Sequence, residues 1–330
     1  MLCVDNLSVH YDLPRRRWFA GRTKVAAVEH VSLKIRQGET LGVVGESGSG
    51  KSTLAKAVLG LVAVRRGVVT IDGERIVRER APLPDLRRRI QMVFQDPLGS
   101  LNPRLPVGRS IVEPLRNFRP DLPGEVVAKE LGAVLRRVGL EEHHASRYPH
   151  EFSGGQCQRI AIARALISSP RWLVCDEVVS ALDVSAQAQI LNLLRDIQQD
   201  TGLGMLFISH DLGVVRYVSH RVAVMFAGTV LEAGETDRVL ASPRHPYTRM
   251  LMDSVLSPKP GTGRLREMTP AVFDNLRSRS ESGCVYRSRC PVALARCARD
   301  VPLLRVSEDG HEVACFHDSL PGGDYAQVAR

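Results

Sequence analysis

A glycine-rich segment between an apolar run and a helical pattern constrains this 330-residue chain more than any other feature. Residues 45–53 read GESGSGKST and match the phosphate-binding consensus G-x-x-x-x-G-K-[ST]. The apolar residues 40–44 precede it, and Leu54, Val58 and Leu61 follow it at helical spacing. A strand–loop–helix unit of this kind turns main-chain N–H groups and a helix N-terminus toward phosphate oxygens. The sequence therefore predicts a nucleoside triphosphate site.

The whole loop is expected to contact the nucleotide. The predicted ATP-binding residues are Gly45, Glu46, Ser47, Gly48, Ser49, Gly50, Lys51, Ser52 and Thr53. The Lys51 ammonium should reach the β- and γ-phosphates, and the Ser52 hydroxyl should ligate Mg²⁺. We expect Lys51 to lie in a solvent-facing loop, so that its replacement leaves folding intact.

Composition excludes several classes of protein. No apolar run approaches the roughly 18 residues of a membrane span, and the first residues lack the pattern of a signal peptide, so we expect a cytosolic chain. The net charge of +9 suits nucleic acid, an anionic membrane face or an acidic partner. An aromatic content of only 5 % and the lack of an RNA-recognition signature argue against nucleic acid.

Strand and helix patterns alternate along most of the chain, which indicates an α/β fold with a mostly parallel sheet. Residues 2–10 alternate apolar and polar and predict an edge strand. Residues 96–150, with helical runs at 110–118 and 125–138, predict an inserted helical subdomain. A change to Pro, Gly and basic residues near 258 separates a main domain, 1–257, from a linker and tail, 258–330.

Two further segments carry charge or anion-binding chemistry. The apolar run that starts at Leu173 ends in Asp176 and Glu177, where the end of a parallel strand would face the phosphate loop. Ser153 and Gly154 open a helix and would form a second anion site. Because the phosphate loop already holds one triphosphate, a second such site suggests two chains that share nucleotides across an interface.

These motifs in this order resemble the ATP-binding subunit of an ATP-binding-cassette (ABC) transporter over essentially all of 1–260. The resemblance implies a P-loop NTPase fold with a RecA-like core, an antiparallel β subdomain and the inserted helical subdomain. The matching motifs are the signature Ser153-Gly154-Gly155-Gln156, the D-loop with Asp183, the Q-loop Gln95, the switch His210 and the adenine-stacking Tyr11.

The resemblance also implies roles and partners. Ser52, Gln95 and Asp176 would hold Mg²⁺, Glu177 would orient water, and His210 would contact the γ-phosphate. The signature motif would close the ATP site of a second ABC ATPase, and the helical subdomain would carry movement to two integral membrane permeases. An extracytoplasmic binding protein would deliver the solute, and this chain would sit on the cytoplasmic face of the membrane.

Residues 92–104, 180–189 and 245–249 resemble the oligopeptide/dipeptide/nickel importer subfamily, which implies peptide import. The alternatives are import of nickel or another small solute, an exporter ATPase, and a soluble ABC ATPase that acts on ribosomes or DNA. Phe152, Cys157 and Val178 depart from the usual residues of the family and remove no phosphate, metal or water ligand.

The chain has seven cysteines, of which Cys3, Cys157 and Cys175 lie in apolar or helical runs and predict small buried side chains. The other four cluster in the tail, namely Cys284, Cys290, Cys297 and Cys315. Four thiolates suit an iron–sulfur cluster or Zn²⁺, and unliganded buried cysteines are the third possibility. Related importers include members with a [4Fe–4S] cluster in a similar tail. His311 and His317 are expected at the surface.

Overall fold

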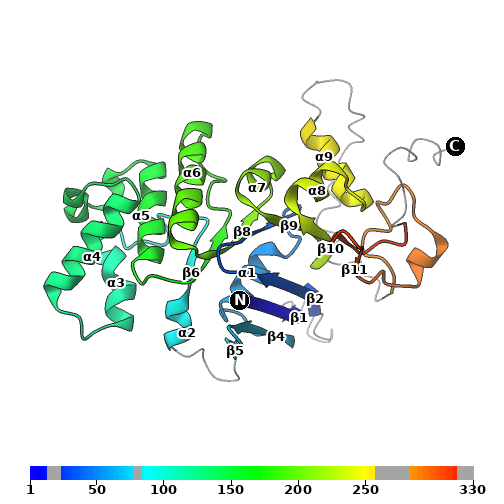
Figure 1. Ribbon diagram of the computed structural model, residues 1–330, viewed down its shortest axis with the longest axis horizontal. Helices are drawn as coiled ribbons and strands as arrows, with labels where there is room; N and C mark the ends of the chain where they lie inside the picture. The colour runs from blue at the N-terminus through cyan, green and yellow to red at the C-terminus, as the bar shows by residue number, and fades with distance from the viewer. Residues whose placement is uncertain (13–23, 77–83, 257–281, 318–330) are drawn as a thin grey trace, which may run out of the picture.

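The computed structural model describes residues 1–12, 24–76, 84–256 and 282–317, which fold around two β-sheets (Figure 1). The small sheet has four strands in the order β2-β1-β4-β5, and the large sheet has eight in the order β11-β12-β10-β9-β3-β8-β7-β6. The sequence also predicts a basic turn at 15–22, and this turn and the linker expected after residue 257 lie outside the described residues.

The large sheet is parallel in its centre, as the sequence predicted. Its parallel strands are β3 (Thr40–Val44), β6 (Ile90–Val93), β7 (Trp172–Asp176), β8 (Gly204–Ser209) and β9 (Arg221–Phe226). Every residue of β3, β7 and β8 is buried, because both faces of a parallel sheet are covered. Continuous apolar runs therefore marked these strands correctly in the sequence.

The small sheet corrects one prediction. Its strands are β1 (Leu2–Asp12), β2 (Lys24–Ile35), β4 (Arg66–Ile71) and β5 (Glu74–Arg75). The predicted edge strand is wrong, since β1 pairs with both β2 and β4, and Leu2 faces Ile35 on one side and Ile71 on the other. Alternating polarity reports which face of a strand is buried and carries no information about its lateral neighbours.

The two helical runs predicted at 110–118 and 125–138 are confirmed. They are α3 (Val107–Phe118) and α4 (Gly124–Arg137), which stand beside α5 (Gly154–Leu166) at the left of Figure 1. The turns η1 (Glu142–Ser146) and η2 (Pro149–Glu151) lead from α4 into α5. Buried apolar residues of these helices join the core around β7 and β8, so the insertion packs on the sheet.

The remaining helices surround the sheets. They are α1 (Lys51–Val58), α2 (Pro84–Arg89), α6 (Val184–Thr201), α7 (Leu212–Val218), α8 (Thr236–Ala241) and α9 (Pro246–Leu256). Within the part of the chain that the structure describes, none of the helices has the length and hydropathy that a membrane crossing requires.

Residues 282–317, called the extension below, join the large sheet at its edge. They contain η3 (Ala295–Ala298), β11 (Arg305–Val306) and β12 (Glu312–Val313), and β12 pairs with β10 (Thr229–Glu235). The described part of the tail thus adds strands to the sheet of the main domain.

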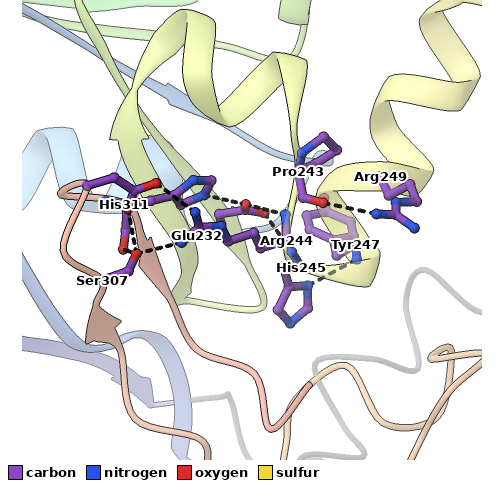
Figure 2. Close-up of polar contacts among 9 residues, drawn as sticks. Glu232, Pro243, Arg244, His245, Tyr247, Arg249, Ser307 and His311 are labelled. Carbon is purple, nitrogen blue, oxygen red and sulfur yellow. Dashed lines mark hydrogen bonds and ion pairs between the residues drawn. The ribbon is translucent and has the colours of Figure 1, made fainter. Parts of the chain in front are cut away.

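A buried carboxylate ties the extension to the main domain (Figure 2). Glu232 is fully buried, and it accepts hydrogen bonds from the main-chain N–H groups of Arg244 and His245 at 2.6 and 3.0 Å. His311 Nε2 lies 2.6 Å from the same carboxylate. The expectation that His311 lies at the surface is therefore wrong, because a buried carboxylate needs partners and this imidazole is one of them. His317 is half-buried and contacts the Val292 carbonyl oxygen at 2.7 Å.

Candidate nucleotide site

The phosphate loop lies between β3 and α1, as its sequence context predicted. Residues 45–50 form the loop, and α1 begins at Lys51. Gly50 adopts φ = +101°, and a Cβ there would lie 2.2 Å from the Ala27 carbonyl oxygen, so only glycine fits. The loop is thereby forced close to β2 and directs the N-terminus of α1 toward the phosphate position.

Lys51 is buried, which overturns the expectation of a solvent-facing side chain. It is 4 % exposed, and its Nζ donates to the carbonyl oxygens of Gly45 and Glu46 at 2.7 and 2.9 Å. Burial lowers the pKa of Lys51, and the nearby carboxylates of Glu177 and Asp176 oppose that shift. The ammonium is therefore held under the loop by two carbonyl oxygens of the loop itself.

A metal-binding pair forms where α1 meets β7. The Ser52 hydroxyl donates to Asp176 Oδ1 at 3.0 Å, so the two predicted Mg²⁺ ligands are brought together. Burial raises the pKa of Asp176, the hydrogen bond from Ser52 lowers it, and the charge of Glu177 raises it again. A hydroxyl beside a carboxylate is a donor set that suits Mg²⁺, which takes one or two carboxylates and completes its shell with water and phosphate.

Glu177 lies at the centre of a second cluster. Gln95 Nε2 donates to Glu177 Oε2 at 2.9 Å, and His210 Nδ1 lies 3.5 Å from Glu177 Oε1. The three residues follow β6, β7 and β8, whose carboxyl ends meet at one edge of the sheet. Glu177 has φ = +50°, a left-handed conformation that is costly for a non-glycine residue and is typical of functional sites.

The signature motif caps α5. The Ser153 hydroxyl accepts from the Gln156 N–H at 3.3 Å, and the Gln156 side chain accepts from the Ser153 N–H at 3.0 Å. The Asp183 carboxylate caps α6 by accepting from the Ala186 N–H at 2.9 Å. Gly154 and Gly155 complete the motif, and all of these residues line one open pocket of about 480 Å³. In Figure 1 helix α5 stands with α3 and α4, apart from α1.

Tyr11, predicted to stack on adenine, lies near the end of β1 and is 41 % exposed. Its ring is accessible to a ligand. The stacking role stays a prediction.

Two residues that sequence reasoning missed contact the phosphate loop. The Tyr247 hydroxyl accepts from the Glu46 N–H at 3.0 Å, and the Arg289 guanidinium donates to both Glu46 carboxylate oxygens at 2.8 Å. Tyr247 belongs to the 245–249 segment that suggested the importer subfamily, but nothing there pointed to the loop. Arg289 lies 243 positions from Glu46, so no local pattern could have found it.

The four tail cysteines gather within the extension. The Cys284 N–H donates to the Cys297 carbonyl oxygen at 2.8 Å, and burial raises the pKa of Cys284, Cys290 and Cys315, the last to about 11. The His317 N–H donates to Cys315 Sγ at 3.4 Å, and this hydrogen bond lowers the pKa of that thiol against the larger effect of burial. Within the described ranges, however, no three His, Cys, Asp or Glu side chains are arranged to hold a metal ion. Of the other cysteines, Cys157 and Cys175 are buried as predicted, and Cys3 is half-buried.

Comparison with known proteins identifies two matching families. Residues 28–180 match the family described as ABC transporter, and residues 231–297 match the family described as oligopeptide/dipeptide transporter, C-terminal region. The chain is 47 % identical over 321 residues to the oligopeptide transport ATP-binding protein OppF of Salmonella typhimurium, with 96 % of each chain covered. It is 48 % identical over 318 residues to a putative peptide import ATP-binding protein of Brucella abortus, with 94 % of this chain and 92 % of the relative covered.

Solved structures agree with the cassette fold. The dimeric post-hydrolysis state of the ATP-binding cassette MJ0796, bound to ADP and Pi, superposes with a TM-score of 0.62 at 30 % identity and covers 72 % of this chain and 99 % of that one. CbiO1 from Clostridium perfringens, part of an ABC transporter complex, gives 0.63 at 29 % identity and covers 73 % and 90 %. With the phosphate loop, Asp176 and Glu177 in place, these matches show that the chain belongs to the ATP-binding subunits of oligopeptide-type ABC transporters.

Proposed function

We propose that this chain hydrolyses ATP to power the import of di- and oligopeptides through membrane permease subunits. The observation that carries the proposal is the arrangement of Gln95 and His210 on Glu177, beside the Ser52–Asp176 pair. This arrangement combines residues for a metal ion, a carboxylate for water and a histidine for the γ-phosphate at one edge of the sheet.

Each residue has a defined task in hydrolysis. Lys51 and the loop N–H groups bind the β- and γ-phosphates. Ser52 and Asp176, with Gln95, would hold Mg²⁺, which would supply positive charge to balance the charge that develops on the phosphate oxygens. Glu177 accepts a hydrogen bond from the attacking water and orients it toward phosphorus. Because the transition state is charge-rich, positioning and electrostatics supply most of the rate enhancement.

The second nucleotide surface implies a head-to-tail pair of ATPases. Ser153 and the N–H groups of Gly154 and Gly155 would contact the γ-phosphate held by a partner subunit, which is another ABC ATPase and most simply a paralogue. The MJ0796 cassette, solved as a dimer with ADP and Pi, supports this arrangement. ATP would close the pair, and hydrolysis would release it.

The helical subdomain would transmit that closure to two permeases, which places the chain peripherally on the cytoplasmic face of the membrane. The match over 231–297 and the names of the relatives favour peptides, with delivery by an extracytoplasmic binding protein. Nickel import, export, and action on ribosomes or DNA remain the alternatives for the test below.

Deletion of the gene should stop growth of an amino-acid auxotroph on peptides that contain the required amino acid, while growth on the free amino acid continues. The reason is that no ATPase would power the permeases. Restoring the wild-type gene should restore growth, and the tagged chain should co-purify with two membrane subunits and a second ATPase. Normal peptide use after deletion, or co-purification with ribosomes or DNA instead, would contradict the proposal.

We also propose that the extension binds a [4Fe–4S] cluster through its four cysteines. The proposal is supported by the grouping of the four thiols in the extension and by the His317 N–H, which donates to Cys315 Sγ as main-chain groups do to thiolate ligands. No thiol set is prearranged in the described residues, so ligation would have to draw the sulfurs together. The cluster would serve as a structural staple.

Anaerobically purified protein should be brown and contain about four irons per chain, because each thiolate would ligate one iron of the cluster. Visible absorption and metal analysis measure this. Replacing Cys290 by Ser should remove most of the iron, whereas Cys3→Ser should not. If the protein is colourless and contains one zinc per chain, the extension binds structural zinc and no cluster. If it is metal-free and its extension is still ordered, neither metal site exists.

A further inference from the structure

Glu46 is held at all three of its polar groups. Its carbonyl oxygen accepts from Lys51 Nζ at 2.9 Å, and its N–H donates to the Tyr247 hydroxyl at 3.0 Å. Its carboxylate accepts two parallel hydrogen bonds from Arg289, each 2.8 Å long. A bidentate guanidinium–carboxylate pair of this kind fixes orientation as well as charge. The extension therefore reaches directly into the phosphate loop.

Aromatic side chains pack around Arg289 and hold its guanidinium in position. Its guanidinium lies 5.5 Å from the ring centre of Phe226, the last residue of β9, and 5.9 Å from that of Tyr286. Phe226, Tyr247 and Tyr286 form one cluster with ring centres 4.8–5.4 Å apart, and both tyrosines are almost fully buried. The Arg289 side chain is 30 % exposed and that of Glu46 is 25 % exposed, so solvent screens the pair only in part.

Charge explains why a partner for Glu46 matters. A carboxylate in a phosphate-binding loop repels the triphosphate and attracts the ammonium that should bind it. The Glu46 carboxylate acts electrostatically on Lys51, and it favours the charged form of that side chain. Without a counter-charge, Glu46 would compete with the phosphates for Lys51.

We propose that Arg289 is a positioning residue of the ATP site, which neutralises Glu46 and so leaves Lys51 free for the β- and γ-phosphates. The inference rests on the proposed ATPase function and deepens it, because it gives the extension a role in nucleotide affinity. Arg289 acts through Glu46. The hydrolytic residues Glu177 and Gln95 come from other elements, so affinity should respond and the chemical step should not.

Arg289→Ala should raise the KM for ATP by about three- to tenfold and change kcat by less than about twofold, the size expected for one partly exposed charge pair. The measurement is steady-state ATPase activity of the full-length chain, with the Kd for ATP measured separately. Arg299→Ala is the matched control, since Arg299 is an exposed arginine of the same extension. Arg289→Lys should recover part of the loss, because it keeps the charge without the two-pronged geometry.

The Glu46→Gln variant tests the same ion pair by removing its negative charge. Alone, it removes a negative charge while Arg289 remains, so the KM should fall by about twofold. Combined with Arg289→Ala, it should recover most of the affinity lost in the single Arg289 variant. A KM for Arg289→Ala equal to that of Arg299→Ala would overturn the inference.

A double variant as weak as Arg289→Ala would also overturn it, because the loss would then come from damage to the extension. Failure of the wild-type chain to bind or hydrolyse ATP would contradict the proposed function instead. The two failures are therefore distinguishable.

Discussion

Replacing Glu177 by Gln is expected to leave ATP bound and to slow its hydrolysis by about 10²–10⁴-fold, the range for loss of a general base. Glutamine keeps the shape of the side chain, and its remaining carbonyl oxygen can still accept from Gln95, 2.9 Å away in the native site. What is lost is the negative charge that orients and polarises the attacking water. The nucleotide contacts of Lys51 and Ser52 remain, so affinity should persist.

Single-turnover hydrolysis and equilibrium ATP binding measure the two effects separately. Glu308→Gln is the control, because Glu308 is an exposed glutamate of the extension. ATP should trap the Glu177 variant in a closed pair with its partner ATPase, which gel filtration of the co-expressed subunits would detect. Collapse of ATP affinity would mean that Glu177 serves the metal or the fold.

Sequence patterns predicted those parts of the fold that are dictated by burial and local geometry. The strands β3, β7 and β8 are buried on both faces, and the apolar runs of the sequence predicted these strands. Gln95 and His210 were assigned only from the resemblance to the family, and the structure places both beside Glu177 because the ends of parallel strands share one edge of the sheet.

Contacts between distant segments could not be predicted in the same way. His311 is buried through its contact with Glu232, which lies 79 positions away. The Glu46 carboxylate is bound by Arg289, which is also distant in the sequence. Neither residue shows periodicity or motif spacing, because the meeting point is set by how the extension packs on β10 and α9. The position of β1 inside its sheet escaped prediction for a related reason, since strand order is a property of the assembled sheet.

Replacing Lys51 by Ala should abolish ATP hydrolysis and reduce ATP binding to background, because the charge that holds the β- and γ-phosphates disappears. The burial of Lys51 adds a second effect that the sequence did not suggest. Its Nζ satisfies the carbonyl oxygens of Gly45 and Glu46, and the variant leaves both without this donor. The Gly45 residue is buried and Glu46 is half-buried. A buried acceptor left unpaired costs about 1–3 kcal/mol, so the variant should also unfold at a lower temperature.

ATP binding, ATPase activity and thermal unfolding of the Lys51 variant should be compared with those of Lys56→Ala, an exposed lysine of the same helix. The control should keep its unfolding temperature, because the Lys56 side chain is exposed and alanine favours the helix. Circular dichroism below the transition should show that the Lys51 variant is still folded, so that its inactivity reports the lost charge. Normal turnover in that variant would contradict the nucleotide site itself, whereas inactivity with an unchanged unfolding temperature would contradict only the structural role of the ammonium under the loop.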